Sequence, residues 1–87
     1  MRLNYIYIAS PYSHPDPEVM AWRVKQAQEH CAKLFDRNLA CYSPIAHWAP
    51  IANAFGLGHG IDKFWRQDEA MLSNARAIHA LLLPGWE

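Results

Sequence analysis

The chain has 87 residues, of which 52% are hydrophobic and 13% aromatic, and its eight basic residues balance its eight acidic residues. This length predicts one small domain over residues 1–87, and the apolar content excludes a disordered chain. The balanced charge provides no basic stripe and no apolar run reaches membrane-spanning length, so we expect no nucleic-acid and no membrane partner.

The N-terminus and the cysteines indicate the compartment. The first residues carry one arginine and no long apolar region, unlike a secretory signal peptide. Cys31 and Cys41 lack CxxC spacing, which favours two buried thiols in a reducing compartment over a disulfide. We therefore expect a cytoplasmic protein. Its apolar residues exceed what so short a chain hides easily, which points to a partner.

The first predicted strand, residues 5–9, is an apolar run without polar alternation that leads into Ser10-Pro11-Tyr12-Ser13. Such a run is typical of a central strand buried on both faces of a parallel sheet, and Pro11 forces the chain out of the sheet. Ligands of open α/β sheets bind beyond the carboxyl ends of the strands. Residues 10–14 are therefore expected to form one wall of a small-molecule site. The alternative is an ordinary proline turn.

A helix is predicted over residues 17–36, with Asp16 as its N-cap and Pro17 as its first residue. Its apolar residues recur every three or four positions, which predicts one buried stripe. Asn38 is suited to the left-handed conformation that follows many helices. The members of the stripe are Met20, Val24, Ala27, Cys31 and Leu34.

Two further strands are predicted, at residues 39–43 and 77–83. The helix between the first two strands makes them parallel, so both Ser-Pro ends emerge at one edge of the sheet. Sequential winding gives the order 2-1-3, an α/β fold of the flavodoxin or Rossmann type with the first strand central. The third strand would be an exposed apolar edge, a position at which proteins can associate.

Prolines and glycines interrupt residues 45–60. We expect short helical turns at residues 45–49 and 51–55. The glycine-rich stretch at residues 56–60 suggests a flexible lid.

The second long helix, predicted over residues 63–75 with Asp62 as its cap, places Asp68 in an apolar stripe with Ile61, Phe64, Trp65, Leu72 and Ala75. An inward-facing carboxylate is costly without partners, which indicates a functional residue. The alternative is an aspartate that pairs with Arg66 or Arg76, or that tilts into solvent.

Other constellations are weaker. The histidines and Cys41 lack metal-ligand spacing, so we expect no metal and no cofactor, and His79 is interpreted as a hydrogen-bonded core histidine. Ser10, His47 and Asp68 could form a triad, but neither serine before a proline lies in a GxSxG elbow. The four tryptophans could stack on a base, although core or interface roles are commoner. They are Trp22, Trp48, Trp65 and Trp86.

Four motifs in order resemble a poorly characterised bacterial and phage branch of the nucleoside 2-deoxyribosyltransferase-like superfamily. They are Tyr-Ile-Ala-Ser-Pro-Tyr-Ser-His-Pro, Tyr-Ser-Pro-Ile-Ala-His, Phe-Trp-Arg-Gln-Asp and Leu-Leu-Leu-Pro-Gly-Trp-Glu. The resemblance implies a flavodoxin-like fold, dimers or larger oligomers, and cleavage or exchange of the N-glycosidic bond of 2′-deoxynucleosides or their 5′-monophosphates.

The same resemblance implies roles for seven residues. Asp68 would hold the sugar and, with Tyr12, act in catalysis. The remaining positions would border the deoxyribose and base: Ser10, Pro11, Ser43, Pro44 and His47.

Two departures from the family pattern bear on catalysis. Arg76 stands where relatives often carry an aspartate. The nucleophilic glutamate of the superfamily follows Pro-Gly-Trp by several residues and has no counterpart here, since Glu87 belongs to the turn itself. We therefore expect a shortened version of the five-strand fold. It is either a transferase or hydrolase of this type, or an inactive nucleotide-binding or self-associating protein.

Overall fold

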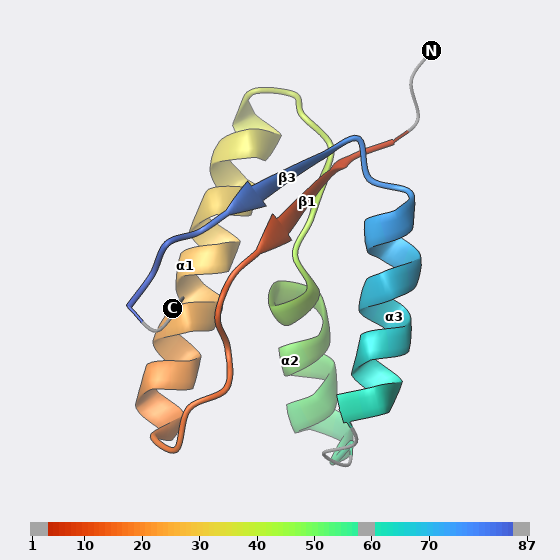
Figure 1. The fold of residues 1–87 in the computed structure, drawn as a ribbon. Coiled ribbons are helices and arrows are strands. Elements are labelled where there is room, and N and C mark those ends of the chain that lie inside the picture. Colours follow the sequence, from red (N-terminus) through yellow and green to blue (C-terminus); the bar gives the residue numbers. More distant parts are fainter. Residues whose placement is uncertain (1–3, 58–60, 85–87) are drawn as a thin grey trace.

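The computed structural model describes residues 4–57 and 61–84, excluding the side chains of residues 61 and 62. Three strands and three helices follow one another along this part of the chain (Figure 1). Their bounds are β1 Ile6–Ala9, α1 Pro17–Asp36, β2 Cys41–Tyr42, α2 Pro44–Phe55, α3 Ile61–Ser73 and β3 Ala77–Ala80.

The strands form one parallel sheet in the order β2-β1-β3, which confirms the predicted α/β topology with β1 in the centre. Ile6 lies opposite Cys41 on one side and Ala77 on the other. The outer strands are shorter than predicted, at 41–42 and 77–80. The short central strand limits their length. β1 has only four residues before the chain leaves the sheet toward Pro11, so the outer strands have few backbone groups to pair with.

The core lies between the sheet and α1. Ile8 of β1 is completely buried, and Ile6 and Leu34 pack in the same cluster. Cys31 and Cys41 lie against this cluster as free, half-buried thiols. Burial, with a smaller effect of Cys41, raises the pKa of the Cys31 thiol to about 12, so this cysteine is protonated and unreactive at neutral pH.

Helix α1 begins and ends as the sequence predicts. The Asp16 carboxylate accepts a hydrogen bond of 2.9 Å from the Glu18 amide, and Pro17 is the first helical residue. The helix closes at Arg37, and Asn38 has φ 60°, the left-handed conformation expected after a helix end. His30 of α1 also meets His79 of β3, with 3.1 Å between Nε2 and Nδ1, which confirms His79 as a hydrogen-bonded histidine.

The prediction of separate helical turns in residues 45–55 was wrong, because α2 is one continuous helix that contains Pro50. A proline inside a helix costs about 3 kcal/mol. Capping and packing offset that cost: Ser43 Oγ accepts from the Ala46 amide at 3.1 Å, and Ala49 is buried. Gly56, the first residue of the expected lid, closes α2 with φ 58°, and residues 58–60 of that stretch lie outside the described residues.

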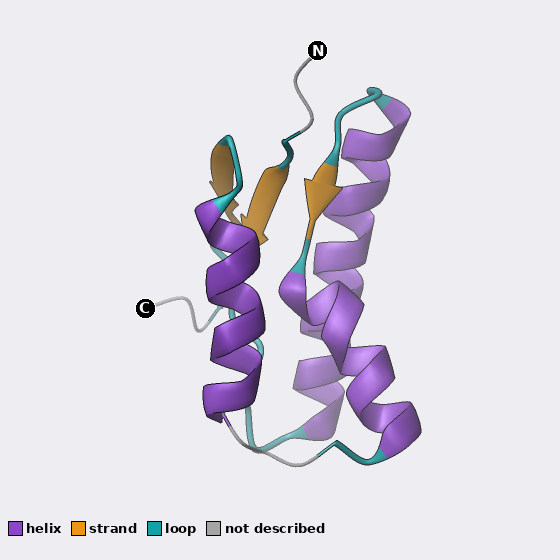
Figure 2. Ribbon diagram, turned by 90° about the vertical axis from the view of Figure 1, so that its right-hand side faces the viewer, coloured by secondary structure: helices purple, strands orange, loops and turns teal. Residues whose placement is uncertain are grey.

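Helix α3 begins at Ile61, so Asp62 lies inside its first turn and not at the cap. Figures 1 and 2 show α2 and α3 flanking the carboxyl end of β1, with α1 away from α3. Tyr5 forms hydrogen bonds at the C-terminal end of α3. Its hydroxyl donates to the Met71 carbonyl, and its carbonyl accepts from the Arg76 amide at 2.8 Å. Across the described residues, no helix has the length and apolarity required to span a membrane.

Candidate functional site

A cavity of about 1010 Å³ lies at the carboxyl end of the central strand. Three groups of described residues line it. The first runs from β1 into the following loop (Tyr7, Ile8, Ala9, Ser10, Tyr12, Ser13), the second is α2 and its end (Pro44, Ile45, Trp48, Ala49, Ala52, Asn53, Gly56, Leu57), and the third is α3 (Phe64, Asp68). Ligand cavities of α/β proteins occur at this position.

Four of the seven residues singled out from the sequence meet in this cavity. They come from three separate segments: Ser10 and Tyr12 after β1, Pro44 at the start of α2, and Asp68 on α3. Ser10 Oγ and Asp68 Oδ1 are both buried and have no hydrogen-bond partner among the described residues. Trp48, another lining residue, also has a buried, unpaired Nε1. Buried polar atoms are rarely left unpaired, so three among the residues of one cavity mark it as a place where a ligand or water can bind.

The other three residues lie beside the cavity without lining it. Ser43 is only 3% exposed, and its hydroxyl is occupied as the N-cap of α2. His47 is exposed, and its ring lies 5.6 Å from that of Tyr42 and 5.0 Å from that of Trp48, centroid to centroid. Pro11 is half-buried between the lining residues of the loop. Ser43 and Pro11 are therefore chain neighbours of lining residues and not part of the lining itself.

Asp68 is half-buried in the wall formed by α3. Burial raises the pKa of its carboxyl group above the ordinary value, because water solvates the charged form less well there. Arg66 and Arg76 are both exposed, and within the described part of the chain neither forms an ion pair with Asp68. The carboxylate thus faces the cavity with one oxygen free to accept a hydrogen bond.

The negative charge of Asp68 affects the pKa values of two nearby tyrosines, Tyr7 and Tyr42. Burial first, and the Asp68 charge second, raise the pKa of Tyr7 to about 12. The pKa of Tyr42 is also raised, mainly by burial, while the nearby Trp48 indole offsets part of the rise without reaching hydrogen-bond geometry. Both phenols are therefore protonated at neutral pH. Tyr7, which lines the cavity, serves as a neutral hydrogen-bond donor or acceptor.

Sequence reasoning did not single out the aromatic pair that connects α2 with α3. The rings of Trp48 and Phe64 meet edge to face with 6.2 Å between centroids, and both line the cavity. Trp48 Nε1 is buried and makes no hydrogen bond within the described residues. The sequence contained a weak signal for this pair, since Trp48 follows Pro44 by one helical turn and Phe64 precedes Asp68 by one turn on α3.

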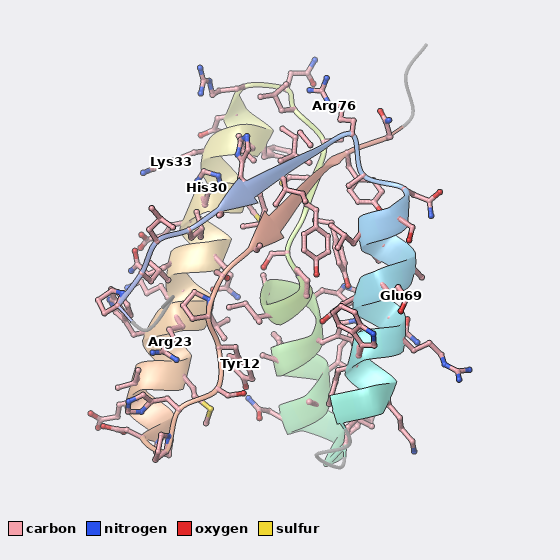
Figure 3. The ribbon with its side chains drawn as sticks, viewed as in Figure 1. Tyr12, Arg23, His30, Lys33, Glu69 and Arg76 are labelled. Carbon is pink, nitrogen blue, oxygen red and sulfur yellow. The ribbon has the colours of Figure 1, made fainter. Side chains whose placement is uncertain are left out.

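Arg23 was also missed. Its side chain is only 6% exposed, and its guanidinium group donates to the Ser13 carbonyl at 2.9 Å, the Tyr12 carbonyl at 3.3 Å and the Pro84 carbonyl at 3.0 Å. Figure 3 shows it reaching from α1 toward the loop that carries Tyr12. A helical wheel contained the signal, because Arg23 lies one turn from both Met20 and Ala27 of the buried stripe.

Metal binding finds no support in this arrangement. Where the structure describes side chains, no three histidine, cysteine, aspartate or glutamate residues come together as a ligand set. The described lining residues offer one carboxylate, phenol and hydroxyl groups, an amide and aromatic faces. This set suits hydrogen bonding and stacking with a small organic molecule.

Comparison with curated proteins finds no match. A family model, however, matches nearly the whole chain, over residues 4–87. The match covers every strand and helix described above, together with the loop, α2 and α3 residues that form the cavity. The chain therefore belongs to the family described as "Domain of unknown function (DUF1937)".

Proposed function

We propose that the cavity binds a 2′-deoxynucleoside or its 5′-monophosphate, in a cytoplasmic protein related to the nucleoside 2-deoxyribosyltransferases. One observation supports the proposal above all others. Ser10 and Asp68, which the motif resemblance assigns to the substrate site, lie far apart in sequence, yet each presents a buried, unpartnered oxygen in the same cavity.

The cavity suits the parts of a nucleoside. Trp48, Phe64, Tyr7 and Tyr12 provide aromatic faces for a base. Ser10 and Asp68 provide the polar atoms for sugar hydroxyls, which both donate and accept hydrogen bonds. The volume lies at the upper end of the range of about 300–1,000 Å³ found for small-molecule pockets, so a nucleoside has room to enter.

In this proposal Asp68 orients the sugar and stabilises positive charge. When a base leaves a deoxynucleoside, the anomeric carbon gains oxocarbenium character, which a nearby carboxylate stabilises. Tyr12 is placed to donate a hydrogen bond to the sugar or base. A retaining transfer needs a second carboxylate or another group for acid–base assistance. Among the described lining residues Asp68 is the single carboxylate. We therefore propose that the cavity binds the ligand, and we treat turnover as a separate question for experiment.

A second candidate is a protein that binds a nucleotide without turnover, or that associates with itself. The outer strand β3 favours self-association, because it pairs only with β1 in the described sheet and carries Ile78 at 58% exposure. Leu82, just beyond β3, is 65% exposed. Exposed apolar edge strands are common sites of pairing between chains.

A thermal-shift experiment tests the binding proposal. The 87-residue chain is heated with each of the four common 2′-deoxynucleosides and their 5′-monophosphates, alongside Asp68→Ala and Glu69→Ala. A ligand that binds the folded state raises Tm, by an amount that grows with its concentration relative to Kd. We expect at least one of these ligands to raise the Tm of the natural chain and of Glu69→Ala, but not of Asp68→Ala.

Glu69 is a matched control, because it neighbours Asp68 on α3 but is exposed and does not line the cavity (Figure 3). A folded sample that shows no shift with any ligand would contradict the proposal. An equal loss of the shift in both variants would place the ligand elsewhere. Release of free base from a bound deoxynucleoside, measured by chromatography, then separates an enzyme from a binding protein.

A further inference from the structure

We propose that the cavity selects an uncharged deoxynucleoside and rejects the 5′-monophosphate. This inference rests on the proposed function and decides between the two ligand classes that it leaves open.

The described wall carries a single formal charge, and it is negative. Of the lining residues, Tyr7, Tyr12 and Asp68 are titratable, and none is lysine, arginine or histidine. Phosphate sites in proteins use Arg or Lys side chains, or a run of free amide groups at a helix start. The start of α2 does not provide such a run, because Pro44 has no N–H and the Ala46 amide is bonded to Ser43.

The charge of Asp68 acts across the cavity. It contributes to the raised pKa of Tyr7 on β1 and to that of Tyr42, so its field extends from α3 to the residues of the sheet. The same field opposes any second negative group in the cavity. A nucleoside monophosphate carries a charge between −1.5 and −2 at neutral pH, and like charges brought together in a partly desolvated site repel strongly.

The unpartnered atoms suit a neutral ligand with hydroxyl groups. Asp68 Oδ1 can only accept a hydrogen bond, and Ser10 Oγ can donate or accept. The third unpartnered atom of the lining residues, Trp48 Nε1, can only donate, and a carbonyl oxygen of a base suits it. A sugar hydroxyl donates to the carboxylate, whereas a phosphate dianion has no proton to donate. A 2′-deoxynucleoside therefore offers the free oxygen of Asp68 two donors, its 3′ and 5′ hydroxyls, whereas the 5′-monophosphate keeps only the 3′ hydroxyl.

The buried cation found among the described residues, Arg23, does not change this balance. Arg23 lies behind the Tyr12 and Ser13 segment and does not line the cavity. Its Nη1 and Nη2 groups are occupied by three backbone carbonyls, those of Tyr12, Ser13 and Pro84. Its charge thus holds the loop from the α1 side, while the cavity side presents hydroxyl, phenol and carboxylate groups.

Isothermal titration calorimetry with matched pairs of ligands tests the inference. Each of the four 2′-deoxynucleosides and its 5′-monophosphate is titrated into the natural chain, into Asp68→Asn and into Glu69→Gln, at pH 7.5 and low salt. Both substitutions remove one negative charge and preserve size, but only Asp68 faces the cavity. The natural chain should bind the nucleoside on the order of tenfold more tightly than the monophosphate.

The ratio of the monophosphate Kd to the nucleoside Kd should stay the same in Glu69→Gln and fall toward one in Asp68→Asn. It should also weaken as salt is raised, because salt screens the repulsion. Monophosphate binding as tight as nucleoside binding, or tighter, in the natural chain would overturn the inference while leaving the proposed function standing. A preference that Asp68→Asn leaves unchanged would also overturn it. If neither ligand binds the folded chain, both the inference and the proposed function fail.

Discussion

At the scale of single residues, Asp68 and Arg23 show two ways of placing an ionised group inside a small α/β protein. Arg23 is almost fully buried, and its Nη1 and Nη2 groups donate to three carbonyl groups, while its Nε has no partner among the described residues. Asp68 is half-buried and has one oxygen without a partner. The hydrogen bonds of Arg23 contribute to structure, whereas the unpaired oxygen of Asp68, which faces a cavity, reduces stability and is typical of binding sites.

The raised pKa of Asp68 leads to a pH-dependent prediction. A folded-state pKa above the unfolded value means that the folded chain binds more protons between those two values, so the free energy of unfolding falls as pH rises through that range. Asp68→Asn should therefore stabilise the unliganded chain at pH 7. The gain stays below about 1 kcal/mol, because much of the side chain remains in water.

Urea unfolding of Asp68→Asn at pH 7 and near pH 4 provides the measurement. The difference from the natural chain should narrow at the lower pH, where the natural Asp68 takes up its proton. Glu69→Gln is the control and should show little difference at pH 7, since its side chain is exposed. A loss of stability in Asp68→Asn at pH 7 would mean that the carboxylate has a favourable partner.

At the scale of elements, the loop after β1 is held in place from α1. The Arg23 hydrogen bonds join Tyr12 and Ser13 to the Pro84 carbonyl, and thus connect the cavity wall with the chain beyond β3. We expect Arg23→Met to reduce the free energy of unfolding by about 2 kcal/mol, because three hydrogen bonds from a charged donor to part-buried carbonyls are lost.

Denaturant unfolding of Arg23→Met, with Lys25→Met as the exposed control on the same helix, measures this effect. The control should change stability by no more than about 0.5 kcal/mol, as is usual for surface substitutions. Equal effects of the two substitutions would show that the guanidinium group does not hold the loop.

At the scale of the whole molecule, the topology could be predicted because a few residues decide it. Pro11 ends β1, Asp16 and Pro17 begin α1, and a helix between two short apolar strands makes them parallel. The pairing of strands then brings Ser10 and Pro44 to one edge of the sheet. The inward position of Asp68 followed from helical spacing alone.

The rest depends on packing that no local pattern contains. Pro50 predicts a break, but the Ser43 cap and the burial of Ala49 keep α2 continuous. Arg23 looks like a surface residue until its carbonyl partners are brought together by the fold. Trp65 belongs to the apolar pattern of α3, yet it is 58% exposed, because α3 turns a narrower face inward than the pattern suggests.

The exposed edge of the sheet gives a prediction for assembly. If β3 pairs with a second chain through Ile78, the molecular mass by sedimentation should rise with concentration, and Ile78→Lys should return it to that of the monomer. The introduced charge opposes burial of the strand edge. Phe35→Lys is the control, because Phe35 is 79% exposed but lies on α1. This substitution should leave the association unchanged. A concentration-independent monomer would contradict association through this edge.

The most direct test of the binding site is an NMR titration of the ¹⁵N-labelled chain with the 2′-deoxynucleoside that raises Tm most, or with all four at millimolar concentration if none does. We predict shifts of the backbone amides of Ser10, Tyr12, Trp48 and Asp68, and of the Trp48 indole N–H, with the amides of Ile78 and Phe35 unmoved. Shifts confined to β3 and α1, or no shifts in a well-dispersed spectrum, would contradict a nucleoside site at the carboxyl end of β1.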